Sequence, residues 1–118
     1  MDPRRRLGNA GEDAVAAWYE AAGYRVLDRN WRCRDGELDL VVSRHTTLVF
    51  CEVKTRGSAR FGAPVEAVTA TKQRRLRMLA ARWLAEHDTR RPALRFDVAS
   101  VTRSANGELV VEVLESAF

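Results

Sequence analysis

The sequence has few of the residues that mark a secreted, membrane-bound or disordered protein. It contains two cysteines and three prolines in 118 residues, and Cys33 and Cys51 do not have the spacing of a zinc-binding pair. No apolar run is long enough to cross a bilayer. The arginines at 4–6 are not followed by the apolar core of a secretion signal. We therefore expect a cytoplasmic protein with two free thiols and no membrane partner.

The remaining composition is that of one globular domain. Apolar residues make up 46% of the chain, which excludes a disordered protein, and the length suits a single domain over 1–118. Residues 1–8 are expected to form a loose basic leader. The net charge of +4 is dominated by arginine. This balance favours an anionic partner, with DNA as the leading candidate, although many domains share it.

Two amphipathic helices are predicted, over residues 9–22 and 71–87. In the first, Asn9 can act as the cap, and Glu12 then stands at the third position of a capping box. Glu12 also lies on the side that faces the sheet, so a second role as an extra acid remains open. In the second helix, Gln73 lies one turn before the apolar residue Leu76 and should face the sheet edge.

The second helix is rich in basic residues outside its apolar stripe. They are Lys72, Arg74, Arg75, Arg77 and Arg82. Such a density is typical of a helix that faces nucleic acid, but it is also found on ordinary solvated faces. Both interpretations stay open on the sequence.

Five strands are predicted, at residues 24–31, 37–42, 48–54, 94–101 and 109–114. The second and third form a hairpin around a loop of about four residues. Folding about that loop places Val41 opposite Phe50 and Asp39 opposite Glu52. One face of the hairpin is apolar and carries Leu38, Leu40, Val42, Val49, Cys51 and Val53.

The other face is charged at its open end. Asp39 and Glu52 would have Cβ atoms on the order of 5 Å apart and would repel by roughly 3 kcal/mol at an effective dielectric near 20. Protonation or a bound divalent cation would relieve this repulsion. Lys54 projects from the same face as Glu52. A solvated strand with an ion pair between Glu37 and Lys54 is the alternative, but the apolar flanks favour a site.

A loop rich in glycine and arginine follows the third strand, over residues 56–64. It lacks the spacing of a phosphate-binding loop. Because loops beside a rigid site commonly hold the substrate, Arg56 and Arg60 are candidate phosphate contacts, together with Lys72 and Arg75.

Asp39 followed by Glu52-Val53-Lys54 resembles the signature of the PD-(D/E)xK nuclease superfamily. More narrowly, four blocks resemble the YraN-like family of small bacterial proteins, which is described as restriction-endonuclease-like and related to Holliday-junction resolvases. The blocks are Gly11-Glu12, residues 36–40, residues 52–56, and Phe61-Gly62 with Pro64 and residues 66–68. Leu38 stands where the superfamily often has proline.

This resemblance implies an α/β three-layer sandwich, with a mixed central sheet flanked by helices. It implies that Asp39 and Glu52 hold one or two Mg²⁺ or Mn²⁺ ions, with Glu12 as a further ligand. Lys54 would orient or deprotonate the attacking water, and Gln73 would complete the site.

The implied function is a Mg²⁺-dependent DNA endonuclease, with branched or single-stranded DNA as candidate substrates. By analogy with resolvases, a homodimer is one candidate assembly. Because fold does not establish function, two alternatives remain. One is a non-catalytic nucleic-acid-binding module with a nuclease-like fold, and the other is a protein-docking module.

Overall fold

The computed structural model describes residues 3–56, 68–87 and 93–118, with residues 3–8 described as backbone alone. The elements in chain order are α1 (Pro3–Ala21), β1 (Arg25–Cys33), β2 (Gly36–Arg44), β3 (Thr47–Arg56), α2 (Ala70–Glu86), β4 (Ala93–Arg103) and β5 (Leu109–Leu114). In the part of the chain that the structure describes, no helix is long and apolar enough to span a membrane.

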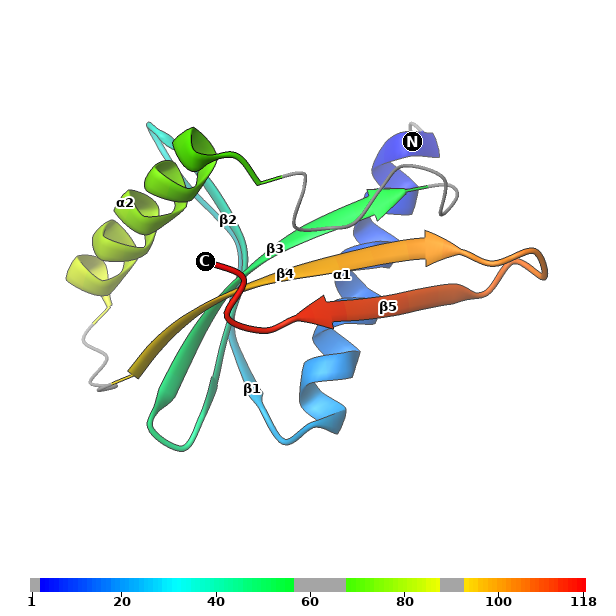
Figure 1. The fold of residues 1–118 in the computed structure, drawn as a ribbon, viewed down its shortest axis with the longest axis horizontal. Helices are drawn as coiled ribbons and strands as arrows, with labels where there is room; N and C mark the ends of the chain where they lie inside the picture. Colours follow the sequence, from blue (N-terminus) through cyan, green and yellow to red (C-terminus); the bar gives the residue numbers. More distant parts are fainter. Residues whose placement is uncertain (1–2, 57–67, 88–92) are drawn as a thin grey trace.

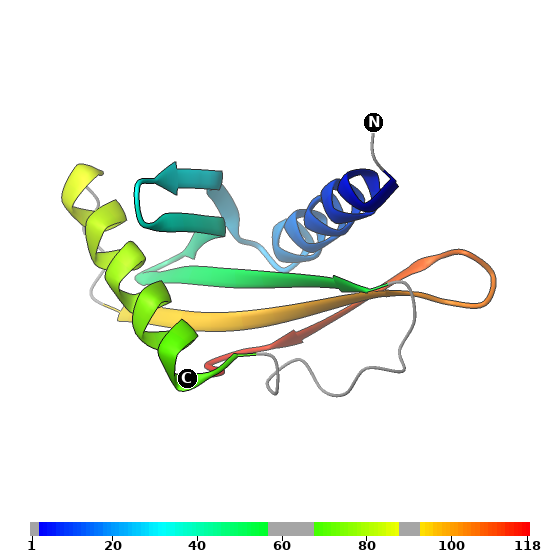
Figure 2. The same ribbon diagram turned by 90° about the horizontal axis from the view of Figure 1, so that it is seen from above.

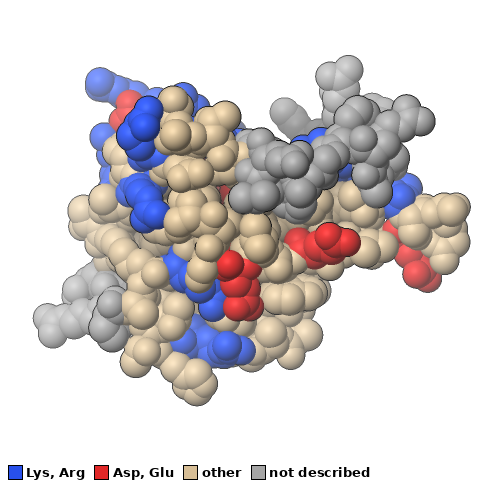
Figure 3. Space-filling view, in the orientation of Figure 1, with Lys and Arg blue, Asp and Glu red and all other residues tan. Residues whose placement is uncertain are grey.

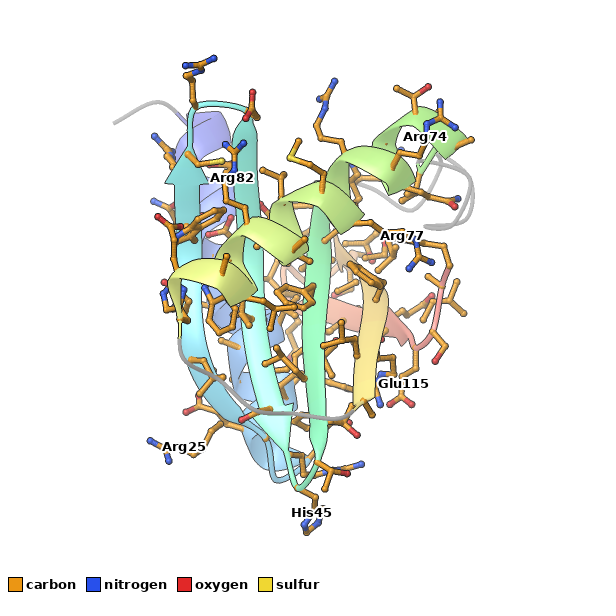
Figure 4. The ribbon with its side chains drawn as sticks, turned by 90° about the vertical axis from the view of Figure 1, so that its left-hand side faces the viewer. Arg25, His45, Arg74, Arg77, Arg82 and Glu115 are labelled. Atoms are coloured by element: carbon orange, nitrogen blue, oxygen red, sulfur yellow. The ribbon has the colours of Figure 1, made fainter. Side chains whose placement is uncertain are left out.

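The strands form one mixed sheet in the order β1-β2-β3-β4-β5. Strands β3 and β4 pair in parallel and are connected through α2, while the other neighbours are antiparallel. Figures 1 and 2 show α1 behind β3 and β4, and Figure 4 shows α2 crossing the opposite face of the sheet. The three-layer α/β sandwich expected from the sequence is confirmed.

Each helix covers its own hydrophobic core on one face of the sheet. Along β3, Leu48 and Phe50 belong to the core under α2, whereas Val49 and Cys51 belong to the core under α1. This alternation is the period of two that a strand imposes. The expected apolar stripe of α2 is confirmed, because Leu76, Leu79, Ala80 and Trp83 are all buried. Both cysteines are free thiols.

The expectation of a loose leader before a helix capped by Asn9 is wrong. Helix α1 already begins at Pro3, and proline at the first helical position has a backbone φ that suits a helix. Asn9 and Glu12 therefore lie inside the helix. Since Glu12 is not near the helix start, the capping-box interpretation of Glu12 is also wrong.

The hairpin register is confirmed close to the turn and altered at its open end. Val41 pairs with Phe50, but regular pairing ends at Leu40 and Cys51, one step before Asp39 and Glu52. Of the predicted common face, Leu40, Val42, Val49, Cys51 and Val53 are confirmed, because they belong to or pack against the core under α1. Leu38 is wrong, because it belongs to the core under α2. The alternation of β2 breaks at Asp39.

This break has a local cause on both sides of β2. The Asp39 carboxylate accepts a hydrogen bond from the Val53 backbone N–H at 2.9 Å. On the other side, Asn30 of β1 has a φ of 52°, in the left-handed region typical of strand irregularities. The strand turns at this point, and Asp39 remains on the side of α2. The hairpin turn itself is shorter than expected, because Arg44 pairs with Thr47.

Candidate active site

A pocket of about 280 Å³ lies between the open end of the hairpin and α2. It is lined by Gly36, Glu37, Asp39, Glu52, Lys72, Arg75, Leu76 and Leu79. The two leucines of the lining belong to the core under α2. The charged side chains of the lining are three acids from β2 and β3 and two basic residues from the first turns of α2. The predicted pair, Asp39 and Glu52, is therefore brought together.

The Glu52 carboxylate disfavours the charged form of Asp39. Asp39 is half-buried, and the Glu52 side chain is 11% exposed. Burial, followed by the negative charge of Glu52, raises the pKa of Asp39 to about 7, and Glu12 and Glu37 add to this rise. The hydrogen bond from Val53 acts in the opposite direction. Near neutral pH the site is thus close to taking up or losing a proton.

The positive charges in contact with Glu52 are lysines. Both lysines of the chain contact Glu52, although 18 of its 20 basic residues are arginine. The Nζ atom of Lys72 lies 2.8 Å from Glu52 Oε1, and that of Lys54 lies 3.5 Å from the same oxygen. Burial and the neighbouring Lys72 lower the pKa of Lys54. Burial alone would lower the pKa of Lys72, but its hydrogen bonds to Glu52 and Lys54, together with the charges of Glu52 and Asp39, outweigh burial and raise it.

The structure places Glu12 near the pair but outside the pocket lining. Its carboxylate accepts a hydrogen bond from Asn30 Nδ2 at 2.9 Å, and its charge contributes to the raised pKa of Asp39. Helix α1 comes very close to β3 here, because a Cβ added at Gly11 would overlap the Thr55 side chain. Glycine at this position is what permits the approach.

Two other predicted roles change. Gln73 does not line the pocket, and its side-chain amide donates to the Val68 carbonyl at 3.3 Å. Glu37 lines the pocket but pairs with Arg32 at 2.9 Å, and not with Lys54 as the alternative interpretation supposed. Lys54 is instead beside Glu52.

Of the predicted phosphate contacts, Lys72 and Arg75 line the pocket. Arg56 ends β3, and Arg60 lies outside the described residues. In Figure 3, basic side chains gather over the surface where α2 lies. Figure 4 shows three labelled arginines projecting from α2: Arg74, Arg77 and Arg82.

Three of the α2 arginines contact other described residues, and one of them, Arg74, donates from Nη2 to Thr71 Oγ1 at 3.3 Å within the same helix. Arg77 stacks over the Phe96 ring at 4.7 Å, and Arg82 forms an ion pair with Asp35. Arg74 and Arg75 are exposed at the end of the helix nearest the pocket. The part of the basic surface best placed to meet a ligand is therefore the first turns of α2.

The donor set suits one kind of metal ion better than others. Within the described ranges, no group of three or more His, Cys, Asp or Glu side chains could enclose an ion. Glu12 is thus not assembled with Asp39 and Glu52 as a third ligand. Mg²⁺ is commonly held by one or two carboxylates, with waters and substrate phosphates completing its octahedron. The pocket fits such a shared ion and does not fit a metal enclosed by protein alone.

The sequence-based interpretation missed a second polar site, on the α1 face of the sheet. Asp97 is fully buried and accepts hydrogen bonds from Tyr19 Oη at 2.6 Å and from Arg95 Nε at 2.9 Å. A lone acid between Phe96 and Val98 was the signal that could have revealed it. The contact of Lys72 with Glu52 was also missed, and the scarcity of lysine was the available signal.

Comparisons with known proteins give a consistent family and no activity. The model of an uncharacterised protein family, UPF0102, matches residues 11–101. A UPF0102 protein of Frankia casuarinae is 52% identical over the full length of both chains. A relative from Beutenbergia cavernae is 54% identical over 97% of each chain. The chain also matches the structure of Pyrococcus furiosus SfsA in complex with Ca²⁺, at 14% identity and a TM-score of 0.41. The match covers 92% of this chain and 62% of the SfsA chain. That similarity is too weak to support an argument.

Proposed function

The chain belongs to the uncharacterised protein family UPF0102, as its sequence blocks indicated, and we propose that it is a metal-dependent nuclease that hydrolyses phosphodiester bonds in DNA. The observation that carries this proposal is the meeting of Asp39 and Glu52 in one pocket with Lys72. Mutually repelling carboxylates without a structural purpose would be costly to keep. Binding of a divalent cation would explain why the two carboxylates are kept together.

Each residue then has a chemical task. When bound, Mg²⁺ would polarise a phosphate oxygen, activate the attacking water and offset charge on the leaving oxygen. Asp39 and Glu52 hold that ion. Burial lowers the pKa of Lys54, which favours transfer of a proton from the attacking water to its amine as the water oxygen bonds to phosphorus and the bond from phosphorus to the leaving oxygen breaks.

The surroundings of the pocket favour a nucleic acid as the substrate. Arg75 lines the pocket and Arg74 lies one residue before it, both exposed. Guanidinium groups bind phosphate oxygens in a forked geometry. With the helix N-terminus beside them, they can position a sugar–phosphate backbone over the acids. This positioning does not select a base sequence, so DNA structure is the expected basis of specificity.

A cleavage screen tests the proposal. Duplex, flap, junction and single-stranded DNA would be incubated with Mg²⁺ or Mn²⁺ and the protein or its variants. Glu52→Gln and Lys54→Met should each lose about 100-fold or more in rate. Glu112→Gln is the matched control, because Glu112 is exposed on β5.

Two outcomes would contradict the proposal. Equal metal-dependent cleavage by both purified variants would show that the activity does not come from this pocket. Salt-sensitive DNA affinity without turnover on any substrate would favour the binding-module alternative.

A further inference from the structure

Glu52 is neutralised from two directions. Lys54 reaches it from the same strand, two residues along, and Lys72 reaches it from α2 on the far side of the pocket. Both ammonium groups approach a single oxygen, Oε1, with Lys72 the closer at 2.8 Å against 3.5 Å. The carboxylate expected to bind a metal ion therefore already has a cation in contact.

A metal ion and an ammonium group compete for the same carboxylate. Mg²⁺ or Mn²⁺ binds a carboxylate oxygen at about 2.1 Å, and a second cation at hydrogen-bond distance from that oxygen would be repelled. One of the lysines must then move. The Lys72 side chain is 30% exposed and lies beside Arg75 at the pocket wall, so its flexible stem can turn toward solvent.

We propose that Lys72 is a displaceable internal counter-ion that couples substrate binding to metal binding. Without nucleic acid, its ammonium group neutralises Glu52 and competes with the metal. A backbone phosphate of the substrate draws the ammonium away and opens Glu52 to the ion. This inference rests on the proposed function for the identity of the substrate, and Lys72 is a positioning residue in it.

The exchange has a thermodynamic consequence. If DNA removes a competitor of the metal, the metal must raise the affinity for DNA by the same factor. Premature binding of the ion is reduced when no substrate is present. Lys54 is not the exchanging group, because it lies farther from Oε1 and is needed at the attacking water.

Mn²⁺ binding measures this coupling without any turnover. The free Mn²⁺ signal would be followed by electron paramagnetic resonance as protein is added, with and without a flap-containing DNA, after subtraction of Mn²⁺ bound to the DNA alone. The variants are Lys72→Met and, as a second neutral replacement, Lys72→Gln. Arg82→Met is the matched control, since it removes a positive charge from the same helix at a residue that pairs with Asp35 and does not line the pocket.

In DNA-free protein, both Lys72 variants should bind Mn²⁺ about tenfold more tightly than the unaltered chain, and DNA should raise the affinity of the unaltered chain by a similar factor. DNA should have little effect on the Lys72 variants and should keep its effect on Arg82→Met. Unchanged or weaker Mn²⁺ binding by the Lys72 variants would overturn the inference, as would an equal effect of DNA on all proteins. Active cleavage beside such a result would leave the proposed function standing. The expected Mn²⁺ result without cleavage of any substrate would instead remove the nuclease proposal alone.

Discussion

Two acidic sites lie on opposite faces of the same sheet and differ in the hydrogen-bond donors that surround them. Asp97, on the α1 face, is enclosed by donors. Arg95 contacts both of its oxygens at 2.9 Å, Tyr19 donates at 2.6 Å, and the backbone N–H of Ser116 donates at 3.1 Å. The cost of burying this charge is met within the fold.

Asp39 and Glu52, on the α2 face, lack such an arrangement of donors around both acids. Asp39 accepts a backbone N–H from Val53, but its charged neighbours include Glu52, Glu12 and Glu37. Glu52 is contacted by lysines, which are mobile and titratable. The difference separates an ion pair that stabilises the fold from a charged site that we propose is completed by a metal ion.

The largest change in the free energy of unfolding should come from removing the partner of Asp97. Arg95→Met leaves the fully buried Asp97 without its forked partner, and we expect a loss of about 3–5 kcal/mol in the free energy of unfolding. Urea denaturation measures this. Arg103→Met is the matched control on the same strand, because Arg103 donates to the exposed Gly107 carbonyl. Equal stability of the two variants would contradict the claim that Arg95 compensates the buried charge of Asp97.

The corresponding change at the other site should have the opposite sign. Asp39→Asn keeps an oxygen for the Val53 N–H and removes a charge that its neighbours repel. We expect this variant to be more stable by about 2 kcal/mol at pH 8, while losing metal binding and cleavage. Urea denaturation at pH 8 checks the stability, and a destabilised variant would argue against mutual repulsion of the acids.

The pH dependence of stability should reveal the same repulsion. The pKa of Asp39 is raised in the folded protein from 3.8 to about 7, so the folded state holds the proton more tightly than the unfolded state. The stability that Asp39 contributes is fully present below pH 4 and is lost as the pH rises through about 7. Subtracting the Asp39→Asn unfolding curve from that of the unaltered protein isolates this contribution. A stability of the unaltered protein that increases with pH relative to that of Asp39→Asn would contradict the assignment.

The smallest effect is expected at the rim of the pocket. Arg32 and Glu37 form an ion pair at 2.9 Å with side chains that are 77% and 44% exposed. Since exposed pairs contribute about 0–1 kcal/mol, Arg32→Ala should change the unfolding free energy by less than about 1 kcal/mol. A thermal melt of the variant checks this, and a larger loss of stability would contradict the small contribution expected for an exposed pair.

The sequence was most informative where local rules decide the structure. The period of two paired Val41 with Phe50, and helical spacing identified the buried stripe of α2 that includes Leu79 and Trp83. The family blocks also pointed to Asp39 and Glu52, which share the pocket. In these cases neighbouring residues are enough to fix which side chains face each other.

The sequence was least informative where distant segments meet. The pairing of Lys72 with Glu52 depends on how α2 lies across the sheet, and that position is set by packing of the whole core. The shift of Leu38 to the other face follows from an irregularity next to Asn30, which no alternation rule describes. The Asp97 network joins α1, β4 and the residues after β5, far apart in the chain.

The claim that unites these observations is that Asp39 and Glu52 together bind a divalent cation. Its most direct test is the calorimetric titration of Mn²⁺ into the DNA-free protein at pH 8, beside Glu52→Gln and the exposed control Glu112→Gln. We expect a binding isotherm for the unaltered chain and for Glu112→Gln, and none for Glu52→Gln. Binding of Mn²⁺ by Glu52→Gln with unchanged affinity would contradict the account.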